Sequence, residues 1–158
     1  MTEAGFIADE LRRAFDGEAW HGDPLFEILQ GVTAAQAAAR PIKNAHSIWE
    51  LMLHIAAWDR AVRTRMTGVA LALSDEENFP PVTDTSEQAW QKALAHARRV
   101  HEELVDAVAK FPAESFSKQV PGKQGAHYNF SFMLHGVAQH EAYHAGQIAL
   151  LKKIVAGR

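Results

Sequence analysis

Two histidines, His140 and His144, lie four residues apart within the long helical stretch 129–155, and this pair constrains the fold most. At about 100° per residue, positions i and i+4 lie on one side of an α-helix, one turn apart. Several apolar residues share that side, namely Met133, Val137, Ile148 and Leu151. We therefore expect both imidazoles inside the buried stripe of the helix, where they can bind one metal ion.

Three further segments have the periodicity of long amphipathic helices, at residues 2–16, 47–67 and 85–111. The second of them begins with a capping box in which Ser47 precedes Glu50 by three positions. No segment has the alternation of a β-strand. Four long amphipathic helices therefore predict an all-α protein, a four-helix bundle that forms one domain over residues 1–158.

The connections between these helices differ in length and character. Residues 18–45 contain signals for two short helical pieces. Residues 68–85 form a polar linker without periodicity, which fully extended would span up to about 60 Å. Such a linker is long enough to cross a bundle from end to end.

Composition limits the classes of partner. A formal net charge of −3 without long charge runs gives no basic stripe, so we expect neither nucleic acid nor an anionic membrane as partner. No stretch approaches the roughly 18 apolar residues of a membrane span, and the N-terminus lacks the features of a secretion signal. We therefore predict a cytoplasmic protein. The absence of cysteine excludes a disulfide scaffold, a Cys-based metal site and a Cys nucleophile.

Two more histidines lie on the apolar stripes of the other helices. His54 lies at the edge of the stripe of helix 47–67, and it can join His140 and His144 only if the second and fourth long helices pack together. His101 lies in the middle of the stripe of helix 85–111. Its position is compatible with a core histidine hydrogen-bonded across the bundle, with a fourth metal ligand or with a catalytic acid or base.

The chain resembles the DinB-like superfamily, whose members are metal-binding four-helix bundles. The resemblance rests on HSIWELMLHIAAWD at residues 46–59 and HEAYHAGQI at residues 140–148, with weaker support at residues 20–22 and 29–37. It implies an up-down-down-up bundle with a long crossover between helices 2 and 3. It also implies that His54, His140 and His144 bind one divalent metal.

Three neutral imidazoles suit a divalent transition metal, with Zn or Ni as the expected ion, and leave an open position for water or substrate. Around this site, Glu141 is a candidate proton acceptor or hydrogen-bond partner of a ligand. Trp58 and Trp90 are interpreted as core residues or as lining of the metal pocket. Tyr143 is a third pocket candidate, and it replaces a histidine that many members of the resembling family have before the last ligand.

A competing interpretation is that of a zinc protease, because HEAYH at residues 140–144 matches the H-E-x-x-H signature in which the glutamate is the general base. A third histidine six residues after the second would fall on Leu150, and no acidic residue follows Glu141. The sequence therefore lacks the third ligand of that class.

Two classes of function remain. The resemblance to a superfamily that includes thiol transferases and thiol-dependent isomerases implies a metal-dependent enzyme, an S-transferase or hydrolase, with a small-molecule substrate such as a low-molecular-weight thiol. The alternative is a non-catalytic metal- or small-ligand-binding protein of a stress response.

The resemblance also implies a homodimer, and helical angles place the apolar Trp49 and Met52 of helix 47–67 on an outer face suited to it. Three arginines of the same helix are interpreted as a solvated face, namely Arg60, Arg63 and Arg65.

Overall fold

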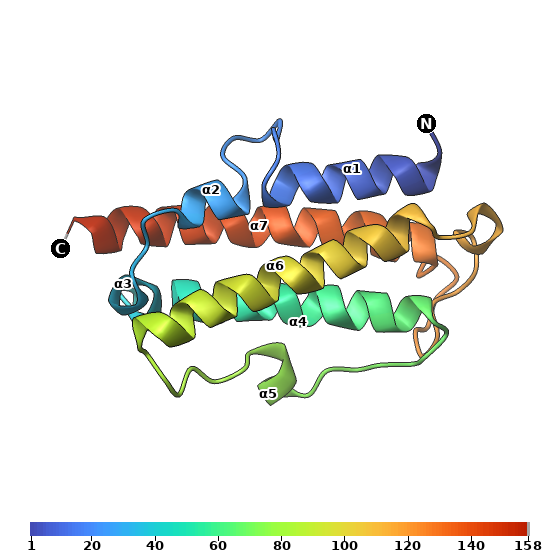
Figure 1. Cartoon of the computed structure of the whole chain (residues 1–158). Coiled ribbons are helices and arrows are strands. Elements are labelled where there is room, and N and C mark those ends of the chain that lie inside the picture. The colour runs from blue at the N-terminus through green and yellow to red at the C-terminus, as the bar shows by residue number, and fades with distance from the viewer. Residues whose placement is uncertain (158) are drawn as a thin grey trace.

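The computed structural model describes residues 1–157, and four long helices dominate it (Figure 1). They are α1 (Glu3–Phe15), α4 (Ile48–Met66), α6 (Glu87–Ala109) and α7 (Phe130–Ala156). In Figure 1, α1 and α7 run in one direction, and α4 and α6 run in the opposite direction. The predicted up-down-down-up bundle is therefore confirmed. Helix α4 packs against α6 and α7, and α1 packs against the same two helices, so α4 and α7 are direct neighbours.

Short helices occupy the connections. The two predicted pieces of the first connection are α2 (Leu25–Leu29) and α3 (Ala34–Ala38). The crossover from α4 to α6 carries a further short helix, α5 (Asp75–Asn78), where the sequence predicted a polar linker without periodicity. A capping box between Ser74 and Glu77 explains its start. A 3₁₀ turn at Ala113–Ser115 precedes α7, and residues 1–157 contain no β-strand beyond an isolated bridge.

Side-chain caps fix the starts of the helices that carry the histidines. Ser47 accepts a hydrogen bond from the backbone N–H of Glu50, whose carboxylate accepts one from the N–H of Ser47. Asn129 accepts a hydrogen bond from the N–H of Phe132 at 2.9 Å. These caps set where α4 and α7 begin, and so the level at which their histidines lie in the bundle.

The apolar residues of α4 that were predicted to lie on an exposed face are buried. Trp49 is only 3% exposed and Met52 is fully buried, and the Trp49 ring lies 4.9 Å from that of Trp90 on α6. The reason is that α3, α5, α6 and α7 surround α4, whereas the prediction assumed that only one side of the helix is covered. These two residues are therefore unavailable to a second copy of the chain. Within the described residues, no helix combines the length and apolar character needed to cross a membrane.

Candidate metal centre

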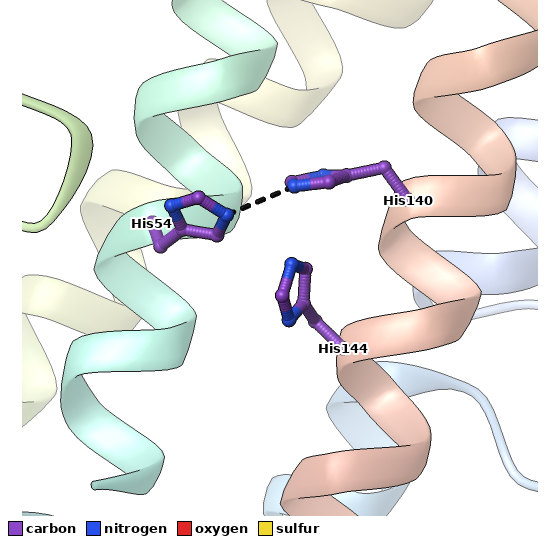
Figure 2. A group of neighbouring side chains, drawn as sticks. All are labelled: His54, His140 and His144. Atoms are coloured by element: carbon purple, nitrogen blue, oxygen red, sulfur yellow. Dashed lines mark hydrogen bonds between the residues drawn. The ribbon is translucent and has the colours of Figure 1, made fainter. Parts of the chain in front are cut away.

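Three histidines converge between α4 and α7, as Figure 2 shows. His54 extends from α4 toward His140 and His144, which extend from successive turns of α7. The Nε2 atoms of His54 and His140 are 2.9 Å apart, and the ring centroid of His144 lies 4.7 Å from that of His54. One ring nitrogen from each histidine lies within 4.8 Å of the others. The predicted convergence thus occurs because α4 and α7 pack together.

Hydrogen bonds orient two of these rings. The Nδ1 of His54 lies 2.8 Å from the backbone carbonyl of Asn78, and the Nδ1 of His144 lies 2.8 Å from Oε1 of Gln147. Both partners are acceptors, so each Nδ1 donates its hydrogen, an assignment that rests on the partners. The Nε2 lone pairs of both rings are then free for a metal, in the arrangement usual for metal-binding histidines. The ring of Phe79 stacks on His54 at 4.1 Å and holds its plane.

Burial keeps the three imidazoles neutral. Desolvation, with smaller contributions from the neighbouring His144 and His54, lowers the pKa of His140 to about 3. The pKa values of His54 and His144 are lowered by the same main cause. A histidine must be neutral to bind a metal, so these shifts favour ligation at neutral pH.

The spacing of the nitrogens fits a transition metal. Two imidazole nitrogens bound at about 2.1 Å are separated by about 3.0 Å at a right angle and by about 3.4 Å in a tetrahedron. The 2.9 Å between Nε2 of His54 and Nε2 of His140 matches the first value. No fourth His, Asp or Glu of residues 1–157 joins the group. The described chain therefore supplies three ligands of this type and leaves a further position for a small molecule.

A pocket of about 370 Å³ adjoins the three histidines and runs between α4 and α7. Its α4 wall consists of His54, Trp58, Val62 and Arg65, and Asn78 of the crossover closes one side. Its α7 wall and rim are formed by apolar and aromatic residues and the two ligands, namely Tyr128, Phe132, Met133, Gly136, Val137, His140 and His144. Water or substrate can reach the histidines through this pocket.

The three predicted pocket residues lie in different places. Trp58 lines the pocket, and its Nε1 donates a hydrogen bond to Oδ1 of Asn78 at 2.8 Å. Trp90 is fully buried outside the pocket and donates to the backbone carbonyl of Val32. Tyr143 is 66% exposed beside His144 and does not line the pocket. Only Trp58 is positioned to contact a ligand there.

A second buried cluster joins α4, α6 and α7 next to the metal centre. The Nδ1 of His101 lies 3.2 Å from Oδ2 of Asp59 and 3.0 Å from Oε1 of Glu141, and both carboxyl groups are fully buried. The ring of His101 also stacks on Phe15 of α1 at 3.7 Å. His101 is thus the predicted core histidine bonded across the bundle, and it belongs to a group separate from the three metal-site histidines.

The charges of this second cluster are strongly coupled. Burial alone would lower the pKa of His101, but its hydrogen bonds to Asp59 and Glu141 and their charges outweigh it and raise the pKa to about 9. Burial raises the pKa of Glu141 to about 8, with Asp59 adding to the shift and His101 opposing it. At neutral pH the cluster therefore favours a protonated imidazole held between two buried carboxyl groups.

Glu141 does not line the pocket, although it lies between His140 and His144 in the sequence. Its carboxyl group points to His101 on the other side of the helix. The general base of an H-E-x-x-H protease has to reach the metal-bound water, which this placement prevents. The structure therefore gives no support to the protease interpretation.

Comparison with known proteins identifies the family. A sequence model of the DinB superfamily matches residues 19–148. The chain belongs to the DinB superfamily. Neither the curated proteins nor the solved structures include a match. The matched region contains all three histidines, and this family assignment together with their geometry indicates a metal-binding site.

In this member of the DinB superfamily, the buried side of α7 differs from the side that the sequence predicted. The buried face of α7 is centred on Glu141 and Ala145, whereas His140 and His144 lie half-buried at its edge, beside the pocket. The stripe of apolar residues was correctly recognised, but its centre was placed too close to the histidines. This displacement gives both ligands access to the pocket.

Sequence reasoning missed three residues that shape the site. Asp59 was not recognised as a partner of His101, and Asn78 was assigned to a polar linker without periodicity. Arg65, interpreted as part of a solvated face, is 1% exposed and lines the pocket. Arg60 and Arg63 are partly exposed, as expected. The distance of Arg65 from His54, eleven residues or about three helical turns, was the available signal that both share one side of α4.

Proposed function

We propose that this protein is a metal-dependent enzyme that transfers a low-molecular-weight thiol to a small-molecule acceptor. The proposal assigns a divalent metal, zinc or nickel, to His54, His140 and His144. The observation that carries it is that these ligands converge at an open pocket and lack a fourth His, Asp or Glu partner among the described residues. A structural zinc site is instead closed by four protein ligands.

The residues of the chain bind and orient rather than exchange protons. Hydrogen bonds to Asn78 and Gln147 fix the imidazoles of His54 and His144, and leave the Nε2 atom of each ring available to the metal. Apolar side chains from both helices exclude water from a ligand in the pocket. When bound, a divalent metal supplies Lewis acidity that lowers the pKa of a coordinated thiol or water.

The pocket lining favours thiol transfer over hydrolysis. Apart from histidines and Arg65, the described lining contains no titratable group that could act as a general base near neutral pH. A thiol has an ordinary pKa of about 8.5, whereas bulk water has one of about 15.7. A thiol therefore needs much less help from a base, which suits this lining.

His101 and Glu141, the two predicted catalytic residues, are better described as positioning residues. Neither lines the pocket, and both are held in the Asp59–His101–Glu141 cluster. Because Glu141 lies between the two ligands of α7, its contact with His101 fixes the rotation of that helix. The expected effect of these residues is on the geometry and affinity of the metal site.

A non-catalytic binding protein is the second candidate, and the same lack of a general base favours it. The test is to load the protein with zinc or nickel and incubate it with several low-molecular-weight thiols and electrophilic acceptors. We expect thiol consumption that requires metal and disappears in His54→Ala, while His135→Ala, which changes a partly exposed histidine of α7, retains it. Metal-dependent binding of a thiol without turnover of any pair would favour the binding protein.

A homodimer remains a proposal that rests on family resemblance, since Trp49 and Met52 are buried within one chain. Sedimentation at micromolar concentration tests it, and a species of 17.5 kDa, the mass of one chain, would refute it. The proposed cytoplasmic location calls for fractionation of cells.

A further inference from the structure

Arg65 is a buried cation that shares the pocket with the three histidines. Its side chain is 1% exposed, and its Nε donates a hydrogen bond to the backbone carbonyl of Leu71 at 2.9 Å. Its Nη1 is buried and has no hydrogen-bond partner within residues 1–157. Arginine stays charged at physiological pH. A guanidinium is thus held inside the protein with part of its hydrogen-bonding capacity unused.

The surroundings of Arg65 offer only partial compensation for its charge. The guanidinium lies 5.2 Å from the centroid of the Trp58 ring, a distance at which a cation–π interaction is favourable. The described residues that line the pocket include no carboxylate. A buried charge is strongly unfavourable without an opposite charge, and Arg65 and a divalent metal would both be positive. A ligand can supply the missing negative charge.

The distance between Arg65 and the histidines suits one small molecule. The Trp58 ring lies 5.2 Å from Cζ of Arg65 and 5.8 Å from the ring centroid of His140, so these two groups are at most about 11 Å apart. The pocket of about 370 Å³ has the volume of roughly twelve water molecules. A molecule of about that many non-hydrogen atoms can contact both ends of the pocket.

We propose that Arg65 is the anion-binding residue of this pocket and that its ligand is a small organic carboxylate with an apolar body. The carboxylate binds the guanidinium, and the apolar body contacts Val62, Met133 and Val137. A monoanion matches the single cationic side chain of this lining, whereas a phosphate dianion would leave a charge unpaired against apolar walls. The proposal extends the proposed function by naming the substrate class, but the contact with Arg65 requires no metal.

Two probes of equal shape test the inference: 3-phenylpropanoate, which is anionic, and 3-phenylpropanamide, which is neutral. Their affinities are measured by calorimetry on protein freed of metal with a chelator. We expect wild type to bind the acid at least tenfold more tightly than the amide. Arg65→Gln should abolish this difference and change the affinity of the amide by less than about twofold, because glutamine keeps a donor for Leu71.

Arg63→Gln is the matched control, since Arg63 belongs to the same helix but pairs with Glu103 at 2.9 Å and does not line the pocket. It should retain the acid preference of wild type. If Arg65→Gln fails to fold, as circular dichroism would show, Arg65→Lys takes its place. Lysine keeps the charge without the planar fork, so a reduced but measurable preference is expected.

The metal-free arm separates this inference from the proposed function, because a carboxylate can also bind zinc. The double variant His140→Ala, His144→Ala should keep the acid preference while losing the metal. An acid preference that depends on Arg65 would support the inference even if wild type fails to bind zinc, a failure that would refute only the proposed function. Equal affinities for the two probes, no binding of either, or a preference that survives in Arg65→Gln would overturn the inference, even if zinc binds.

Discussion

Replacing His101 with leucine is predicted to destabilise the protein by about 3–5 kcal/mol near neutral pH. The imidazole is the hydrogen-bond partner of Asp59 and Glu141, and both carboxyl groups are fully buried. Leucine is similar in size, so the loss comes mainly from two carboxyl groups that remain in the core without their partner. The total free energy of unfolding of a domain is only about 5–15 kcal/mol, which makes such a loss large.

The pH dependence distinguishes this electrostatic cost from a packing defect. The pKa of His101 is raised to about 9, so its stabilising contribution is complete below its ordinary value of 6.5 and is lost as the pH rises through about 9. The deficit of the variant should therefore be larger at pH 6.5 than at about pH 8, because at the higher pH the unfolded imidazole has lost its proton while the folded one retains it. A packing defect would cost the same free energy at both pH values.

The assay is urea unfolding followed by circular dichroism at both pH values, on protein freed of metal so that metal binding does not contribute. With an m-value of about 1–3 kcal/mol/M, the midpoint should shift by on the order of 2 M at pH 6.5. His96→Leu is the control on the same helix, since His96 is exposed and its ring hydrogen-bonds to the exposed Arg99, and the change should cost less than about 0.5 kcal/mol. A loss below about 1 kcal/mol for His101→Leu, or an equal deficit at both pH values, would refute the reasoning.

Three further predictions concern the metal centre and its pocket. Zinc at a free concentration of about 100 times its dissociation constant should add about 2.7 kcal/mol to the free energy of unfolding, and an equal gain in His140→Ala would contradict the assignment. Because the pKa values of all three ligands are lowered, zinc affinity should fall little from about pH 8 to 6.5; a steep fall in zinc titrations over this range would count against it. Gly136→Leu should weaken binding of small molecules with zinc content unchanged, since Gly136 lines the pocket and an added Cβ meets nothing within 4 Å; unchanged binding by calorimetry would oppose this.

The fold was predictable because its main signals are local. Capping residues such as Ser47 and Asn129 determine where α4 and α7 begin in the sequence, and the apolar periodicity that follows each cap identifies the segment as a long helix. The spacing of His140 and His144 likewise puts both on one side of a single helix, whatever surrounds it. His54 is different, since its approach to the pair depends on which helices pack together. The sequence alone left that open, and family resemblance supplied it.

Residues of α4 were the hardest to predict, because four other elements surround this helix. Periodicity assigns one buried side and one exposed side, which failed for Trp49 and Arg65. Asp59 was missed for a related reason: its importance comes from His101 and Glu141, which lie about forty positions away or more in the sequence. A buried polar group is recognisable only when its partners are known.

The crossover has a role beyond connecting α4 to α6, because it holds three side chains of the α4 pocket wall. Its backbone carbonyls accept hydrogen bonds from His54, at Asn78, and from Arg65, at Leu71, while the Asn78 side chain accepts one from Trp58. The metal ligand, the indole at the centre of the pocket and the guanidinium are thus oriented by the same segment. Two of these contacts use backbone atoms, which side-chain motifs cannot reveal. The polar linker that carried no periodicity therefore sets the geometry at both ends of the pocket.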